Sequence, residues 1–115
     1  MPSINFKQQF VAAIEQGRKR QTIRKLRKRP FESGDTLYLF TLMRTANCRR
    51  IGQFTCIRVR NIRIESMQIF VENEPLNDRQ ISELARADGF ANSAEMMQFF
   101  ATQHKLPFVG QIIYW

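Results

Sequence analysis

A dense basic segment with one hydroxyl group is the part of this sequence whose residue types most readily suggest chemistry. Lys19 lies between two arginines, and Thr22 follows three positions later, within residues 17–24, GRKRQTIR. Neighbouring positive charge favours the neutral form of a lysine, so we expect the pKa of Lys19 to be lowered towards that of a usable base. A base beside a hydroxyl is, in outline, the arrangement that nucleophilic catalysis of the serine–lysine type uses.

Strand geometry limits this catalytic interpretation. Residues 19 and 22 point to opposite faces of a regular strand, so the two side chains converge only if Lys19 lies on a turn and the strand begins near Gln21. Two other interpretations stay open for the same residues, namely an anion-binding face and a run of charges that is merely solvated.

The basic segment continues to residue 29, with eight basic side chains in the twelve positions of RKRQTIRKLRKR. Like charges repel along a regular element, so we expect a solvated strand and loop or a flexible arm, closed by Pro30 and a turn at residues 33–35. Two later arginines share one face of an expected strand, where Phe54 or Tyr38 could add base stacking; the alternative is an ordinary exposed strand face. The candidate nucleic-acid-binding residues are Arg18, Arg20, Arg24, Lys25, Arg27, Lys28, Arg58 and Arg60.

A carboxylate is the third group that this chemistry would need, and Asp88 is the candidate. In the functional interpretation, Asp88 is a general acid or a polar anchor close to the basic segment. In the structural interpretation, it occupies the last turn of a helix, with Gly89 as the cap and Phe90 in the core. The spacing of these residues favours the structural interpretation.

The charge of the chain is unevenly distributed. Eighteen Lys and Arg against ten Asp and Glu give a net charge of +8. Residues 1–64 hold 15 basic and 3 acidic residues (+12), whereas residues 65–115 hold 3 and 7 (−4). A chain with one basic half usually presents a positive face to an anionic partner, and nucleic acid is the commonest such partner.

The length of 115 residues predicts a single domain, residues 1–115, which buries about 65% of the surface that the unfolded chain exposes. With 43% hydrophobic and 24% charged residues, the composition is that of a globular protein. The longest apolar run, residues 37–43, is too short to cross a bilayer, and residues near the N-terminus do not resemble a signal peptide. We therefore expect neither a membrane protein nor a secreted protein, and no membrane partner. We also expect a monomer.

The few cysteine and histidine residues bear on metals and location. Cys48 and Cys56 could pair, but we expect reduced cysteines in a cytoplasmic protein. With His104 as the one histidine and no Cys-x-x-Cys spacing, we expect no metal site, and we expect no cofactor.

The elements that must position these residues follow from periodicity and caps. Asn5 and Gln8 indicate a capping box that opens a helix, which ends at Gly17. Strands are expected over residues 36–43, then over 50–64 with a bulge near Arg60-Asn61, and over 67–71.

Two helices are expected next, the first opened by Asn77 and ending near Gly89, the second opened by Asn92 and stopped by Pro107. Residues 108–115 then form a last strand. This order predicts an α+β fold with a curved sheet of the kind that forms a small barrel.

Three parts of the sequence resemble a known family. Residues 17–24 resemble the Gly-x-Lys-x-x-Thr-Ile-Arg motif of the ASCH domain, in the PUA-like superfamily. Residues 33–35, Ser-Gly-Asp, resemble the family's Gly-Asp step into a strand, and residues 88–115 resemble its C-terminal pattern. The resemblance covers nearly the whole chain, and the motif together with the tail is specific.

The resemblance implies a small PUA-like β-barrel with flanking helices and a cleft lined by the Gly-x-Lys segment. Some family members are amidohydrolases of N4-acetylcytidine, and another branch resembles a ribonuclease. By position, Lys19 would be the base and Thr22 the nucleophile. The family's acid is a glutamate, whereas the nearest match here is Asp88, which is one methylene shorter.

These observations support three functions. The first is an RNA-binding module that holds a nucleobase or a short single strand of RNA in a basic cleft. The second is a hydrolase of RNA or of a modified nucleoside that uses Lys19, Thr22 and Asp88. The third is a protein-interaction domain whose basic face meets an acidic partner.

Overall fold

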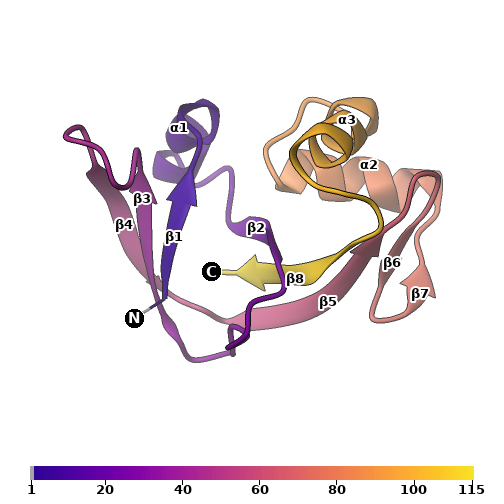
Figure 1. Cartoon of the computed structure of the whole chain (residues 1–115), viewed down its shortest axis with the longest axis horizontal. Helices are drawn as coiled ribbons and strands as arrows, with labels where there is room; N and C mark the ends of the chain where they lie inside the picture. Colours follow the sequence, from indigo (N-terminus) through magenta and orange to yellow (C-terminus); the bar gives the residue numbers. More distant parts are fainter. Residues whose placement is uncertain (1) are drawn as a thin grey trace.

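The computed structural model describes residues 2–115, which form eight strands and three α-helices (Figure 1). The elements in chain order are β1 (Ser3–Phe6), a 3-10 turn (Gln8–Phe10), α1 (Val11–Glu15), β2 (Gln21–Lys25), β3 (Thr36–Thr41), β4 (Arg49–Thr55), β5 (Arg58–Ile64), β6 (Ile69–Val71), β7 (Glu74–Pro75), α2 (Asp78–Ala87), α3 (Ser93–Gln103) and β8 (Phe108–Tyr114).

The strands form two sheets. One has the order β1-β3-β4, with β1 parallel to β3, and the other has the order β2-β8-β5-β6-β7 and is antiparallel. In Figure 1, β1, β3, β4 and α1 lie on one side of the molecule, α2 and α3 lie over the other, and β2 and β8 lie between them. The expected α+β class is confirmed. Within residues 2–115 the strand pairing gives two separate sheets, which hydrogen bonds do not close into a barrel.

The strand β8 is central because it pairs with both β2 and β5. Gly110 makes this pairing possible, since a Cβ atom there would lie 2.1 Å from the backbone oxygen of Arg24. At the end of β8, Trp115 is buried, donates from its backbone nitrogen to Arg20 and packs edge-on against Phe6 of the other sheet. The C-terminal strand therefore joins the two halves of the core.

Several expected elements are confirmed. Strand β3 begins at Thr36 and alternates inward and outward residues, and the buried Ile69 and Val71 lie on β6. Asn77 and Gln80 form a reciprocal capping box at α2, and the Asn92 side chain accepts from the backbone of Glu95 at α3.

The expected helix start at Asn5 is wrong. Asn5 lies in β1, whose alternation buries Ile4 and Phe6, and its side-chain oxygen accepts a hydrogen bond from the backbone of Met43. The first helical turn begins only after Lys7, which makes no side-chain cap. The Asn-x-x-Gln spacing does not mark a capping box here, because Asn5 lies in the strand that pairs with β3.

The single strand expected over residues 50–64 is also wrong. The chain leaves the first sheet at Thr55 and enters the second at Arg58, so the change of apolar phase marks a passage between sheets. No bulge occurs near Arg60, because β5 pairs with β8 without interruption, and the register shift lies instead between β3 and β4, at Leu39/Phe40.

Among residues 2–115, none of the helices is long and apolar enough to span a bilayer.

Candidate functional site

The turn after α1 places Lys19 ahead of strand β2. Gly17 adopts a positive φ of 75°, and the backbone nitrogens of Arg18 and Lys19 both donate to the carbonyl of Ala13. Strand β2 then begins at Gln21. This start is the one that convergence of the Lys19 and Thr22 side chains requires. Both Lys19 and Thr22 are buried.

The C-terminus of α2 supplies the partner of Lys19. Asp88 is the helix C-cap, and Gly89 follows with a φ of +97°. A Cβ atom on Gly89 would lie 2.9 Å from Phe10 and 3.3 Å from the Lys19 side chain. Glycine at this position therefore both turns the chain and leaves room for the buried lysine.

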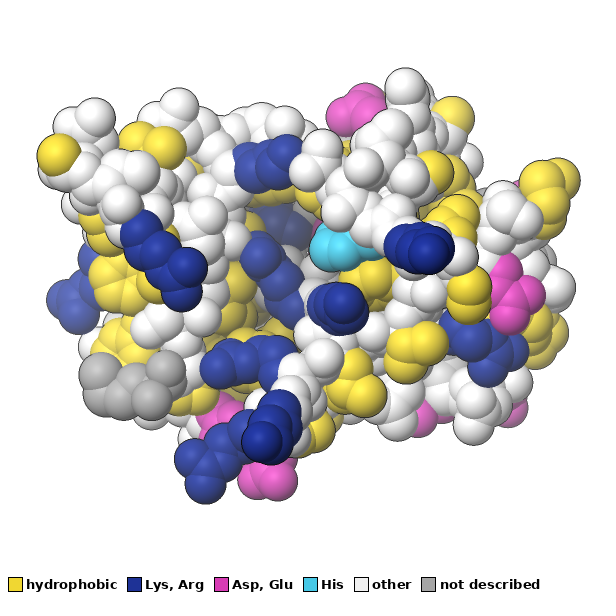
Figure 2. Space-filling view, viewed as in Figure 1, with side chains coloured by type: hydrophobic (Ala, Val, Ile, Leu, Met, Phe, Trp, Pro, Cys, Tyr) yellow, Lys and Arg dark blue, Asp and Glu magenta, His cyan; other side chains and the backbone are white. Residues whose placement is uncertain are grey.

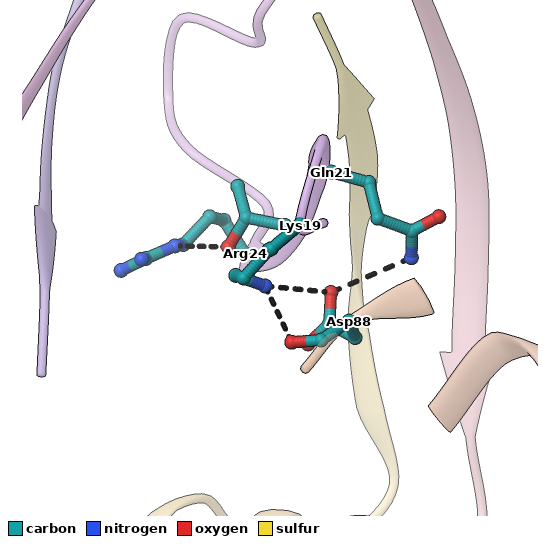
Figure 3. A network of polar contacts seen from close by, with 5 residues as sticks. Lys19, Gln21, Arg24 and Asp88 are labelled. Atoms are coloured by element: carbon teal, nitrogen blue, oxygen red, sulfur yellow. Dashed lines mark hydrogen bonds and ion pairs between the residues drawn. The ribbon is translucent and has the colours of Figure 1, made fainter. Parts of the chain in front are cut away.

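Lys19 and Asp88 contact each other in the interior (Figure 3). The Lys19 Nζ donates to the backbone oxygen of Asp88 at 2.5 Å and lies 3.4 Å from its Oδ1. Gln21 Nε2 donates to the same Oδ1 at 3.4 Å. Asp88 therefore ends the helix, as the structural interpretation predicts, and it also contacts the basic segment as a polar anchor would.

Burial dominates the electrostatics of this pair. Burial lowers the pKa of Lys19, with Arg24 adding to the shift, while attraction to Asp88 opposes it. Burial also raises the pKa of Asp88, and Lys19 and Gln21 oppose that shift. The two pKa values move towards each other, which eases transfer of a proton between the groups.

The expected direction for Lys19 is thus confirmed, but the expected cause is wrong. Arg18 and Arg20 are exposed, and the Arg18 guanidinium donates to Gln16 rather than facing Lys19.

Arg24 joins Thr22 to the aromatic wall of the site. Its Nε donates to Thr22 Oγ1 at 3.0 Å, and its guanidinium carbon lies 4.6 Å from the centre of the Phe6 ring. Lys19 Nζ lies 5.0 Å from the centre of the Phe10 ring. Burial lowers the pKa of Arg24 to about 10, and this guanidinium stays charged at neutral pH.

These side chains surround a cavity of about 240 Å³, which we call the central cavity. It is lined by Asn5, Phe6, Lys7, Phe10, Lys19, Thr22, Ile23, Arg24, Lys25, Asp88, Phe90, Phe99, Phe100, Gln103 and His104. Four basic side chains and one acidic one are among them, together with five phenylalanine rings. Figure 2 shows a hollow in this part of the molecule with Lys and Arg side chains around it.

The basic segment continues beyond Lys25, which lines the cavity at the end of β2, as an anchored loop. Lys25, Arg27 and Lys28 are exposed, and the Arg27 guanidinium lies 4.7 Å from the centre of the Phe31 ring. Phe31 is buried, and its backbone nitrogen and oxygen both bond to the side chain of Gln111 on β8. The exposed loop is therefore fixed at its far end.

The other candidate arginines lie elsewhere. Arg58 is exposed with its guanidinium 5.7 Å from the Tyr114 ring, and Arg60 is half-buried with an Nε that has no hydrogen-bond partner within the described chain. These two, together with Arg18 and Arg20, do not line the central cavity.

Two polar residues next to the candidate side chains, one lining the cavity and one behind it, were not among the candidate site residues. His104 stacks on Phe100, with ring centres 5.6 Å apart and planes 25° apart, and its pKa is lowered by burial, Lys25 and Arg24. Gln21 holds the Asp88 carboxylate. A lone histidine after a helix and a glutamine within a basic run have no spacing that would single them out.

Cys48 and Cys56 are both unpaired thiols, exposed and buried respectively. Within residues 2–115, His, Cys, Asp and Glu side chains do not gather in groups of three or more that could hold a metal ion. In comparisons with known proteins, the chain matches no family model, no curated protein and no solved structure.

Proposed function

We propose that this protein binds single-stranded RNA and holds one nucleobase in the central cavity. The supporting observation is the combination of aromatic walls with a polar floor made by the buried Lys19 and Asp88 and the half-buried Arg24. Nucleobases present a flat apolar face and polar edges, and single-stranded RNA is recognised by stacking together with hydrogen bonds to those edges. The cavity therefore offers the two kinds of contact that a splayed base needs.

The size of the cavity favours one base. Sites for drug-sized ligands span roughly 300–1,000 Å³. A volume of about 240 Å³ is smaller, which suits a single ring system. The rest of the strand would follow the exposed loop at Lys25, Arg27 and Lys28, where phosphates find exposed positive charge.

The packing of the two sheets supports the fold that the resemblance to the ASCH domain implies. A PUA-like barrel is a curved sheet that closes upon itself, and here β8 and Trp115 bring the two sheets together around one core. We propose that the fold is an incompletely hydrogen-bonded version of that barrel, as the resemblance to the ASCH domain implies.

Binding of fluorescein-labelled single-stranded RNA, followed by fluorescence anisotropy, tests the proposal. We expect saturable binding of a single strand, weaker binding of a duplex of the same sequence, and competition by unlabelled single strand. Equal binding of duplex and single strand would leave only non-specific attraction to phosphates, and the base-binding role would be rejected.

A second candidate is an amidohydrolase that removes the acetyl group of N4-acetylcytidine. The observation that favours it is the lowered pKa of Lys19 in the same cavity as Thr22 and Asp88. Neutral Lys19 would take the proton of the Thr22 hydroxyl while Thr22 Oγ attacks the acetyl carbon. Protonated Asp88 would then protonate the departing cytidine amine, and water would hydrolyse the acetyl-Thr22 ester.

The hydrogen bonds favour binding over this reaction. Lys19 Nζ is directed to Asp88, and Thr22 Oγ1 accepts from Arg24, so the nucleophile is paired with a cation rather than with its proposed base. Incubation with N4-acetylcytidine distinguishes the two. Thr22→Val, which removes the hydroxyl at nearly constant volume, abolishes a Thr22-dependent reaction, whereas Thr22→Ser retains part of it.

A further inference from the structure

The outer face of the sheet β1-β3-β4 carries two aromatic side chains that point away from the core. On β3, Leu37, Leu39 and Thr41 are buried, so the alternate residues Tyr38 and Phe40 face outward, where they are half-buried. In Figure 1, α2 and α3 lie over the other sheet. This outer face therefore presents two half-buried aromatic rings on a strand surface that α2 and α3 do not cover.

The charged side chains on β3 and β4 are all arginines. They are Arg49 and Arg50 of β4, and Arg49 is the ladder partner of the buried Thr41 and forms an ion pair with Glu15. Arg50 is the direct partner of Phe40 in the ladder between β3 and β4, so both side chains project from the outer face. Figure 2 shows hydrophobic side chains over β3 and β4 with a Lys or Arg side chain across them, on the same face as the hollow.

The outer face is continuous with the central cavity. Asn5 of the edge strand β1 lines the cavity and is the register partner of Phe40 on β3. Neighbouring strands are about 4.8 Å apart, so a chain leaving the cavity reaches Phe40 by crossing one strand. Tyr38 lies two residues further, about 6.6 Å along β3.

We propose that this face is a second RNA-binding surface, on which two bases of a bound single strand stack on Tyr38 and Phe40 while Arg50 binds a phosphate. The proposal rests on the proposed RNA-binding function. Stacking on aromatic rings combined with positive charge is how single strands are bound without sequence preference. An acidic protein would use the arginines only, whereas Phe40 in register with Arg50, together with Tyr38 two residues along β3, favours an RNA strand.

The test compares two lengths of RNA. Oligouridylates of three and ten nucleotides, each fluorescein-labelled, are titrated with the wild-type chain and with Tyr38→Leu/Phe40→Leu, which keeps apolar bulk but removes the rings. We expect the double variant to bind the ten-mer at least about fivefold more weakly, since stacking contributes about 1–3 kcal/mol per base, and to bind the three-mer within about twofold of wild type.

The chain offers a matched control on the other sheet. Phe70 of β6 is half-buried, projects from the face opposite the buried Ile69 and Val71, and has the Arg63 guanidinium 4.3 Å from its ring centre. Phe70→Leu should leave both affinities unchanged. Arg50→Gln, at an exposed position, provides an independent variant and should lower the salt dependence of ten-mer binding by about 0.7 in the slope of log affinity on log salt.

The outcomes separate this surface from the cavity. If the wild-type chain binds both lengths and neither the double variant nor Arg50→Gln weakens the ten-mer, the second surface is rejected while the cavity proposal stands. Equal weakening of both lengths also rejects it. If the wild-type chain binds neither RNA, the proposed function itself fails, and binding of polyglutamate instead would assign the face to an acidic protein.

Discussion

Lys19 and Asp88, which are 69 positions apart in the sequence, meet inside the protein with side chains only 2% and 7% exposed. The lysine donates to the backbone oxygen of Asp88 and lies 3.4 Å from its carboxylate. A cation at this place also suits the negative end of α2. The contact joins the basic segment to the second half of the chain and forms the floor of the central cavity.

Removal of Lys19 should strongly destabilise the fold, and removal of the Asp88 charge should destabilise it less. Lys19→Met leaves the Asp88 carboxyl buried without its cation, and a broken buried pair typically costs about 3–5 kcal/mol. Asp88→Asn retains the backbone oxygen that Lys19 uses, so its cost should be smaller. The free energy of unfolding from urea titration measures both changes, and a loss below about 1 kcal/mol in Lys19→Met would show that the pair is not important for stability.

Substitution of Gly89 should be more costly than substitution of Gly17, although both have a positive φ. In Gly89→Ala the new methyl group meets Phe10 and Lys19, whereas in Gly17→Ala no atom lies within 4 Å. Backbone strain of this kind costs about 1–3 kcal/mol in both variants, and the collision adds to it only at Gly89. Thermal or urea unfolding of the two variants tests the difference, and equal losses would contradict the packing around Lys19.

The exposed loop should determine the salt dependence of RNA binding. If Lys25, Arg27 and Lys28 each neutralise one phosphate, replacing all three by alanine should reduce the slope of log affinity on log salt by about 2. Because these side chains are exposed, stability should change little. Anisotropy titrations between about 50 and 200 mM salt supply the slopes, and an unchanged slope would place the phosphates elsewhere.

RNA binding should tighten as the pH falls from about 7.5 to about 5.5. The pKa of His104 lies below its ordinary 6.5 in the free protein because of burial, Lys25 and Arg24, so the ring is neutral at pH 7. A phosphate at the cavity rim offsets these cations and raises that pKa, and binding then takes up a proton. His104→Gln should remove this pH dependence, and a wild-type affinity independent of pH would place the RNA away from His104.

The fold class and most element positions could be predicted because their signals are local. Asn77 with Gln80 and Asn92 with Glu95 mark the starts of α2 and α3, and both caps are present. The errors came from signals that depend on pairing. The break at residues 56–57 sends β4 and β5 to different sheets, and periodicity within one segment cannot reveal which sheet a strand joins.

The site residues that lie close together in the sequence could be predicted, whereas those that only packing brings together could not. Lys19, Thr22 and Arg24 are close in sequence, and they line the cavity together with Asp88. The cause of the lowered Lys19 pKa was missed because burial depends on the packing of Phe10 and Gly89 around the side chain, which no local pattern encodes. His104 follows α3 and lines the cavity near Lys25 and Arg24 of β2, a neighbourhood that the local sequence does not reveal.

Nuclear Overhauser effects between RNA and the cavity rings provide the most direct test of base binding. In a complex of the isotope-labelled protein with a short oligouridylate, we expect contacts from base protons to the rings of Phe6, Phe10 or Phe99, with shifted amide signals for Thr22 and Arg24. Saturable binding whose shifted signals are confined to the exposed loop, with no contact to these rings, would contradict a base in the central cavity.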